Sequence, residues 1–121
     1  MDLGLLSTDC TRNPHFCNWT VVYFIYCDGS SFTGSRAETL VANGTRLWMR
    51  DRANLDALYH QLPTNETASG APRFGLTNAS HVIVTGASVG GYFSFYHCDY
   101  IRVIYITDTS VPMHCVPDAG F

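Results

Sequence analysis

The residues whose types and spacing could do chemistry are a serine and its neighbouring glycines, Gly86-Ala-Ser88-Val-Gly90-Gly91. A serine with a glycine two residues away on either side fits the G-x-S-x-G nucleophile elbow, a strained turn between a strand and a helix. Glycines are required there because strand and helix pass too close for side chains. The helix amino terminus leaves unpaired N–H groups, that of Val89 first, which stabilise an oxyanion. The motif therefore indicates acyl transfer through Ser88.

The elements that position this serine can be read from its flanks. Val82-Ile83-Val84 is β-branched without polar alternation, which predicts a strand buried on both faces of a parallel sheet. Residues 89 to about 104 are long enough for a helix. Two other interpretations stay open: an ordinary strand–turn–helix without chemistry, and a dinucleotide-binding glycine loop. The latter is disfavoured because Tyr92 stands where the third glycine belongs and the chain has no lysine.

Composition bounds the class of protein. With 121 residues, 46% hydrophobic and 14% charged, the chain is one domain or part of one. A net charge of −3 without a basic stripe argues against nucleic acid as a partner. No run of about 18 apolar residues is present, so we expect no membrane span. The cysteines show no C-x-x-C pair, and we expect neither a metal nor a cofactor.

Glycosylation signals and cysteines indicate the compartment. Four sequons, together with five cysteines, favour a secreted glycoprotein. The sequon asparagines are Asn18, Asn43, Asn65 and Asn78. Residues 1–9 lack a positive n-region and a sufficient apolar core for a signal peptide. We therefore expect that a signal was lost or that the sequence begins part-way into a longer protein.

The first half of the chain predicts a strand, a ligand-binding loop and a helix. Residues 18–26 are apolar enough for a central strand, and residues 27–34, rich in Gly and Ser, would form the loop at its carboxyl end. Residues 38–42 predict a short strand that ends at the turn dipeptide Asn43-Gly44. From Thr45 to before Pro63 the apolar residues fall at helical spacing. The apolar positions are Trp48, Leu55, Leu58, Tyr59 and Leu62, and a charged face with Arg50, Asp51, Arg52 and Asp56 is expected to be solvated.

The second half completes the predicted architecture. Residues 64–72 read as a polar loop, 107–110 as a turn and 111–117 as a last strand. Strands alternating with helices predict an α/β fold with a mostly parallel sheet flanked by helices.

Seven blocks in collinear order resemble the pectin acetylesterase/Notum family of α/β-hydrolases, closer to the pectin acetylesterase branch. They are Asn13-Pro-His-Phe-Cys-Asn-Trp19, Tyr26-Cys-Asp-Gly-Ser-Ser-Phe-Thr-Gly34, Leu40 through Trp48, Gly75-Leu-Thr-Asn-Ala-Ser80, Gly86-Ala-Ser-Val-Gly-Gly91, His97-Cys-Asp99 and Cys115-Val-Pro-Asp-Ala-Gly-Phe121. The family usually shows Cys and Ala where Ala87 and Val89 stand, and Arg-Gly in place of Asn43-Gly44. These departures concern substrate fit, because the serine and its neighbouring backbone N–H are retained.

The resemblance implies a serine esterase that removes acetyl groups from a cell-wall polysaccharide such as pectin, or a Notum-like protein deacylase. Ser88 would form the acyl-enzyme, and a histidine and a carboxylate would complete the triad. In this family the further oxyanion donors lie upstream of the region shown, and the triad acid and base lie downstream. Residues 1–121 would then be the central segment of an incomplete α/β-hydrolase domain, inactive alone.

Geometry also argues against the chain's own histidines as the base. His97 is nine residues beyond Ser88, about 13 Å along a helix. His114 precedes Asp118 by four strand residues, about 13 Å. His81 opens the strand of Ser88, and His60 closes a helix at the opposite edge. His15 precedes the serine, contrary to the hydrolase order Ser, acid, His.

Three further polar residues are weaker candidates. Asp118 follows the strand after the nucleophile strand, where an acid or a pocket-lining residue could lie. Asp28 is read as a turn residue first and a substrate contact second, and Ser30 is a candidate substrate contact in the same loop.

Cys98 and Cys115 fall on adjacent elements below the sheet edge, which predicts a disulfide. At least one of Cys10, Cys17 and Cys27 must then lack a partner within the chain.

Two classes of function remain on the sequence alone. The first is a serine carboxylic-ester hydrolase, and the second is a non-catalytic α/β remnant that binds a glycan or nothing.

Overall fold

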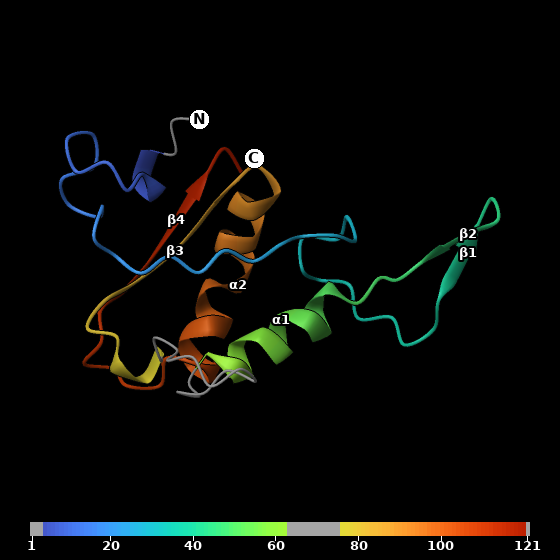
Figure 1. Cartoon of the computed structure of the whole chain (residues 1–121). Helices are drawn as coiled ribbons and strands as arrows, with labels where there is room; N and C mark the ends of the chain where they lie inside the picture. The colour runs from blue at the N-terminus through green and yellow to red at the C-terminus, as the bar shows by residue number, and fades with distance from the viewer. Residues whose placement is uncertain (1–3, 63–75, 121) are drawn as a thin grey trace, which may run out of the picture.

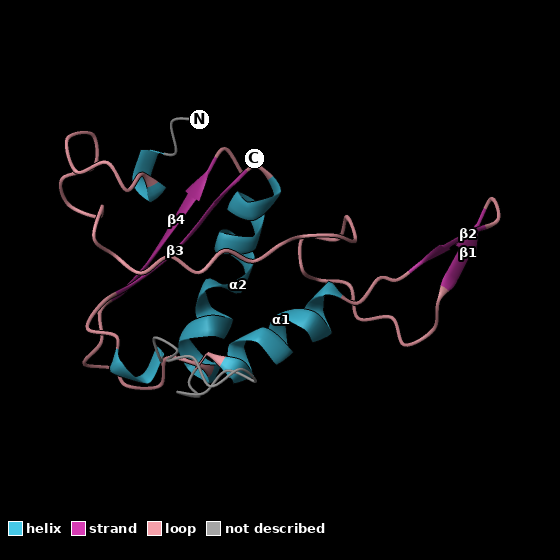
Figure 2. Ribbon diagram, in the orientation of Figure 1, coloured by secondary structure: helices cyan, strands magenta, loops and turns pink. Residues whose placement is uncertain are grey.

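The computed structural model describes residues 4–62 and 76–120, and it contains both helices and strands (Figures 1 and 2). In chain order the elements are the 3₁₀ turn η1 (Gly4–Leu6), β1 (Leu40–Ala42), β2 (Thr45–Leu47), α1 (Asp51–Gln61), the 3₁₀ turn η2 (Leu76–Asn78), β3 (Val82–Ala87), α2 (Val89–Ile104) and β4 (Met113–Asp118). The predicted loop at residues 64–72 lies outside the described residues.

A strand–helix–strand unit forms the part of the fold that holds the serine motif. β3 and β4 pair in parallel, from Val82 opposite Met113 to Ala87 opposite Asp118. α2 connects the two strands and packs against both of them. The strand at residues 82–84, the helix to residue 104 and the following strand are therefore confirmed. Val84 is the one buried residue of β3, because the described part of this sheet has two strands instead of the larger sheet that the sequence predicts.

A short hairpin projects from the rest of the molecule (Figure 1). β1 and β2 pair antiparallel through Asn43 and Gly44, which have φ values of 50° and 77°. This confirms the turn, because consecutive positive φ values are what an Asn-Gly hairpin turn requires. The helix prediction was wrong at its start, since Thr45–Leu47 is a strand and α1 begins at Asp51. Trp48 accordingly lies outside the helix and is 54% exposed.

The strand predicted at residues 18–26 is absent. Residues 20–27 have no regular secondary structure, and among the described residues no strand pairs with them. Two aromatic side chains attach the segment to the core: Phe24 lies 5.3 Å from Tyr59 and Tyr26 lies 5.3 Å from Phe32, between ring centroids. The side chains of Val21, Val22, Tyr23 and Ile25 are exposed. The segment is apolar, but a strand also requires a hydrogen-bonding partner along its edge.

The described residues thus form a mixed helix–strand structure with two two-stranded sheets, one parallel and one antiparallel. The prediction of a mostly parallel sheet flanked by helices is correct only for β3, α2 and β4. No helix within the described ranges is both long and apolar enough to cross a membrane.

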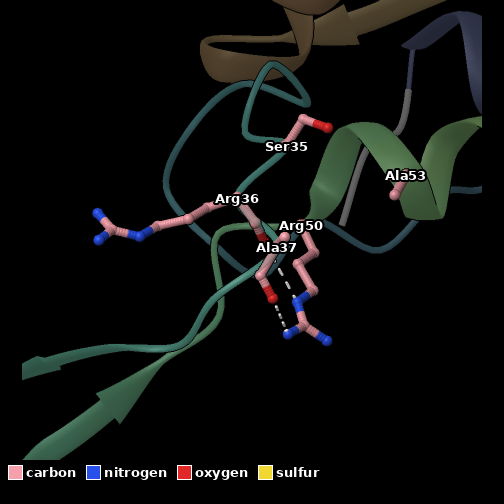
Figure 3. Close-up of a pocket in the computed structure, with 5 residues that line it drawn as sticks. All are labelled: Ser35, Arg36, Ala37, Arg50 and Ala53. Atoms are coloured by element: carbon pink, nitrogen blue, oxygen red, sulfur yellow. Dashed lines mark hydrogen bonds between the residues drawn. The ribbon is translucent and has the colours of Figure 1, made fainter.

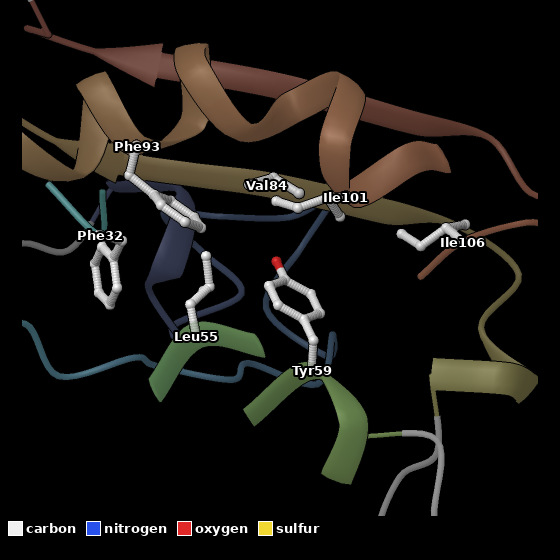
Figure 4. Packing of buried hydrophobic residues seen from close by; sticks show 7 residues of the cluster. All are labelled: Phe32, Leu55, Tyr59, Val84, Phe93, Ile101 and Ile106. Atoms are coloured by element: carbon white, nitrogen blue, oxygen red, sulfur yellow. The ribbon is translucent and has the colours of Figure 1, made fainter. Parts of the chain in front are cut away.

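The hydrophobic core lies between α1 on one side and α2 with β3 on the other (Figure 4). Leu55 and Tyr59 of α1 face Phe93 and Ile101 of α2 and Val84 of β3. Phe32 from the preceding loop and Ile106 after α2 close the two ends of the cluster. Leu55 and Ile101 are fully buried, so the α1–α2 contact is the centre of the core.

Candidate active site

Ser88 occupies the turn between β3 and α2 and is exposed to solvent. Its backbone has φ 55° and ψ −114°, a combination that L-residues rarely adopt. Such a conformation costs on the order of 1–3 kcal/mol and persists only where the surrounding structure enforces it. The strand before it and the helix after it therefore hold the hydroxyl at the carboxyl end of β3, as the elbow motif predicts.

The glycines around Ser88 permit a close contact between backbones. A Cβ added at Gly86 would lie 2.6 Å from the carbonyl carbon of Gly90, so any side chain there would collide with the start of α2. A Cβ at Gly91 would lie 2.5 Å from the carbonyl oxygen of Asp118, and one at Gly120 would lie 2.7 Å from Gly91. A Cβ at Gly90 would meet nothing within 4 Å. Glycine is thus required at positions 86, 91 and 120 for contact, whereas position 90 has room.

Backbone N–H groups at the start of α2 are available beside the serine. The N–H of Ser88 donates to the carbonyl oxygen of Asp118 over 2.9 Å, and the N–H of Tyr92 donates to the carbonyl oxygen of Ser88 over 3.1 Å. The N–H of Val89 has no acceptor among the described residues. Because a helix amino terminus bears partial positive charge, this group can donate to an oxyanion formed at Ser88.

Asp118 lies next to the serine turn on the neighbouring strand. It ends β4 opposite Ala87, the residue before Ser88, and it is exposed. Its carboxylate has no hydrogen-bond partner among the described residues, while its backbone carbonyl accepts from Ser88. The structure thus brings Asp118 to the same sheet edge as Ser88.

None of the five histidines, all of which the structure describes, is hydrogen-bonded to Ser88. His81 precedes β3, and His114 pairs with Ile83, close to the beginning of that strand. His15 makes an edge contact with Phe16. Phe16 contacts Trp19, which in turn contacts His81, so His15 belongs to the far end of β3. His60 ends α1. The hydroxyl of Ser88 has no hydrogen-bond partner within the described parts of the chain.

His97 is a packing residue of α2. It is 4% exposed, and its ring lies 5.0 Å from that of Phe93. Its Nε2 atom is buried without a hydrogen-bond partner among the described residues. Burial, together with the nearby positive charge of Arg52, lowers the pKa of His97 below its ordinary value. Since its side chain is buried against Phe93, this histidine does not serve Ser88.

Asp28 and Ser30 order the loop that precedes the hairpin. The carboxylate of Asp28 accepts hydrogen bonds from the N–H and hydroxyl of Ser30 and from the N–H of Asp51 at the start of α1. Burial opposes ionisation of Asp28, but these hydrogen bonds outweigh it and hold its pKa below the ordinary value. The structure therefore gives Asp28 a turn role, with Ser30 as its hydrogen-bond partner.

Asp51 was misread from the sequence as part of a solvated face. Its side chain is buried, and its Oδ2 atom accepts from the N–H groups of Cys27 and Asp28 at 3.2 and 3.0 Å. With the bond from Asp51 N–H to Asp28, the contact is reciprocal and joins the loop to α1. The partners are more than twenty positions apart, so no local sequence signal could have indicated the contact.

Asp56 is also engaged, contrary to the solvated role expected for it. Its Oδ1 atom accepts from the hydroxyls of Tyr100 and Tyr105, each at 2.9 Å, and from Arg52 Nε at 3.4 Å. Burial raises the pKa of Asp56, but the hydrogen bonds from Tyr105 and Tyr100 outweigh it and lower the pKa overall. This polar cluster joins α1 to the end of α2, away from Ser88.

Two disulfides brace the structure. Cys98 of α2 and Cys115 of β4 are joined with a Cα–Cα distance of 6.0 Å, which is the pair that the sequence analysis expects. Cys10 and Cys17 close a loop in the amino-terminal segment. Cys27 is then the free cysteine, and it is exposed.

The sequons that the structure describes are accessible. Asn18, Asn43 and Asn78 are exposed, and Asn43 lies at the tip of the hairpin. Asn65 lies outside the described residues. Within the described ranges, no group of three His, Cys, Asp or Glu side chains is arranged to hold a metal ion.

Comparison with known proteins identifies the family. The family model described as Pectinacetylesterase matches residues 2–121, so the chain belongs to the pectinacetylesterase family. It is 40% identical over 118 residues to pectin acetylesterase 5 of Arabidopsis thaliana, an alignment that covers 98% of this chain and 25% of the relative. Pectin acetylesterase 4 of the same plant is 36% identical over 118 residues, with 98% and 26% covered. No solved structure matches the chain.

The chain therefore spans about a quarter of the length of the curated relatives that it matches. The relatives' names indicate ester hydrolysis on acetylated pectin, and the resemblance seen in the sequence blocks is confirmed at the level of the family.

Proposed function

We propose that Ser88 is the nucleophile of a serine carboxylesterase that removes acetyl groups from a pectin-like polysaccharide. The single observation that supports this most is the geometry of residue 88, an exposed serine with φ 55° and ψ −114° between a parallel strand and a helix amino terminus. A serine in this position presents its hydroxyl to a substrate and its neighbouring N–H groups to the developing oxyanion.

The reaction would run through an acyl-enzyme. Ser88 Oγ attacks the acetyl carbonyl as a base accepts its proton, the tetrahedral oxyanion is stabilised by the Val89 N–H, and the sugar hydroxyl leaves after protonation. Water then releases acetate and restores the serine. The base and further oxyanion donors are proposed to come from chain beyond residues 1–121, because none of the described histidines contacts Ser88. Asp118 is proposed as the acid or as a residue that lines the acyl pocket.

The domain proposal follows from the same feature. We infer that residues 1–121 are one segment of an α/β-hydrolase domain, in which the exposed side chains of Val21, Tyr23 and Ile25 would be covered by neighbouring elements. The exposed sequons and the disulfides fit a secreted glycoprotein that acts at the cell wall. The 121-residue chain alone is expected to be inactive.

A second candidate is a glycan-binding segment without catalysis. It is favoured by the lack of any histidine beside Ser88 among the described residues. A chimera separates the two: residues 1–121 replace the matched segment of the Arabidopsis pectin acetylesterase 5, and acetate release from acetylated pectin is measured. The esterase proposal predicts activity in the chimera and its loss with Ser88→Ala. A folded chimera that releases no acetate would favour the binding segment.

A further inference from the structure

An open hollow of about 390 Å³ lies where the hairpin joins α1. Its lining comes from the segment before β1, the residue before α1 and the first turn of α1. We call it the basic hollow, and its lining residues are Ser35, Arg36, Ala37, Arg50 and Ala53 (Figure 3). The proposed chemistry of Ser88 uses neither of the two arginines at this place. The basic hollow is therefore a candidate for a binding role of its own.

Arg50 is held in place by the backbone of the hollow. Its Nε atom donates to the carbonyl oxygen of Arg36 at 3.3 Å and its Nη2 atom donates to that of Ala37 (Figure 3). The N–H of Arg36 also donates to the carbonyl oxygen of Met49 over 2.7 Å, which fixes the two flanks together. A guanidinium that is already positioned loses less conformational entropy when an anion binds.

In the described part of the chain, the arginines of the basic hollow form no ion pair with a carboxylate. Figure 3 shows the side chain of Arg36 extending away from the chain on one side while the guanidinium of Arg50 folds against the carbonyls. Within the described residues, no ion pair involves Arg36, Arg46 or Arg50. Residues 36–50 contain these three arginines and one acid, Glu38, in a protein whose net charge is −3. The region is thus locally positive in an acidic chain.

The basic hollow is connected to the serine turn through the core. Phe32, three residues before Ser35, packs on Phe93 with ring centroids 4.9 Å apart, and Phe93 lies in the first turns of α2 after Ser88. The loop that carries Phe32 is fixed by hydrogen bonds from the N–H groups of Ser30 and Asp51 to the carboxylate of Asp28. The chain that leads into the hollow is thus packed against the helix that follows Ser88.

We propose that the basic hollow is a subsite for an anionic polysaccharide, in which Arg36 and Arg50 bind the carboxylates of hexuronate units. The proposal rests on the proposed function, since pectin has a backbone of uronate units and a deacetylase that acts along it must hold the polymer beyond the reacting acetyl group. Guanidinium pairs well with carboxylate because two parallel N–H donors match its two oxygens. An open, shallow hollow suits an extended chain better than it suits a small ligand.

The test is binding of a de-esterified oligogalacturonate to the full 121-residue chain, measured by calorimetry at low salt beside a neutral galacto-oligosaccharide of equal length. We expect the anionic oligomer alone to bind. Arg36→Gln and Arg50→Gln should each weaken binding about tenfold, which corresponds to the loss of one charge-assisted contact. Arg12→Gln is the matched control, because it removes the same charge from an exposed arginine in the amino-terminal segment.

The circular dichroism spectrum of each variant shows whether it is folded. If Arg50→Gln unfolds, binding by Arg36→Gln still tests the proposal, because no described contact uses the Arg36 guanidinium. Equal binding of the neutral oligomer, equal loss in Arg12→Gln, or no binding by the folded chain would overturn the proposal. Ser88→Ala should bind the oligomer as the unaltered chain does. If the chain binds the oligomer but the chimera releases no acetate, the esterase proposal is rejected and the subsite proposal is retained. If the chimera releases acetate but oligomer binding does not depend on Arg36 and Arg50, the subsite proposal is rejected and the esterase proposal is retained.

Discussion

The backbone N–H of Ser88 donates to the carbonyl oxygen of Asp118 over 2.9 Å, so the serine turn is tied to the end of the neighbouring parallel strand. The same carbonyl oxygen lies 2.5 Å from the position that a Cβ of Gly91 would occupy. The conformation of Ser88 is therefore set by β3, the start of α2 and the end of β4 together, and each of these contacts can be tested separately.

Strain at Ser88 predicts an unusual order of stabilities. Replacing serine by glycine normally costs conformational entropy, but at φ 55° and ψ −114° glycine relieves strain. We expect Ser88→Gly to exceed Ser88→Ala in free energy of unfolding by about 1 kcal/mol. Urea denaturation of the two variants measures this difference. Equal stability, or a more stable alanine variant, would show that residue 88 is not strained.

The close contact at Gly91 predicts a strong position effect between neighbouring glycines. Gly91→Ala places a methyl group 2.5 Å from the carbonyl oxygen of Asp118 and should destabilise the protein by about 1–3 kcal/mol. Gly90→Ala is the matched control, because its Cβ meets nothing within 4 Å and alanine favours the helix by roughly 0.5–1 kcal/mol. Thermal melting of both variants gives the comparison. A harmless Gly91→Ala would mean that α2 and the Asp118–Gly120 turn are farther apart.

His97 predicts a loss of stability in mild acid. Its pKa is lowered in the folded state, so the unfolded chain takes up a proton first as the pH falls below about 6.5. The free energy of unfolding should therefore be constant above that pH and decrease below it as the pH falls through the folded-state pKa. His97→Gln should flatten the curve between pH 7 and 5, as followed by urea midpoints at each pH.

A separate loss of stability at lower pH is expected from Asp28 and Asp56. Burial raises the pKa of each carboxyl group, but the hydrogen bonds that each accepts outweigh it and lower the pKa overall. Their contribution is present above about pH 4 and is lost below it. An unchanged slope between pH 7 and 5 in His97→Gln would assign the mild-acid loss to another group.

The Cys98–Cys115 disulfide predicts a measurable share of the stability. The two cysteines are separated by 17 positions, and closing such a loop stabilises by about 3 kcal/mol on the chain-entropy model. The double variant Cys98→Ala/Cys115→Ala should lose an amount of this order in denaturation experiments without reductant. Peptide mapping of the unaltered, unreduced protein provides the independent check, because free alkylation of both cysteines would contradict the pairing.

The sequence predicted well the parts that depend on local chemistry. The turn at Asn43-Gly44 follows from two residues that tolerate positive φ, and the elbow at Ser88 follows from glycines at fixed spacing. β3, α2 and β4 were found because each pattern is continuous along the chain. The site residue Ser88 was therefore placed at its strand end from the sequence alone.

The parts that failed depend on distant partners. Residues 18–26 have the composition of a strand. Composition indicates a tendency to be buried, but it does not show whether a neighbouring strand is present to pair with the segment. The predicted helix was extended back to Thr45 because Trp48 happens to fit the apolar spacing of the helix. Residues Thr45–Leu47 instead form a strand, because they pair with β1 in the hairpin. The burial of Asp51 arises from backbone N–H groups of a loop 23 and 24 positions earlier. None of these contacts leaves a signal in neighbouring residues.

The central claim is that Ser88 is the acyl-accepting residue, and a fluorophosphonate probe tests it most directly. The chimera with the Arabidopsis relative is treated with the probe, digested and mapped by mass spectrometry, with Ser94, buried and bonded to the carbonyl oxygen of Val84, as an internal unreactive serine. We predict an adduct on the peptide that contains Ser88, located at that residue and absent from Ser88→Ala. An acetate-releasing chimera with its adduct on another serine, or with none, would contradict the account.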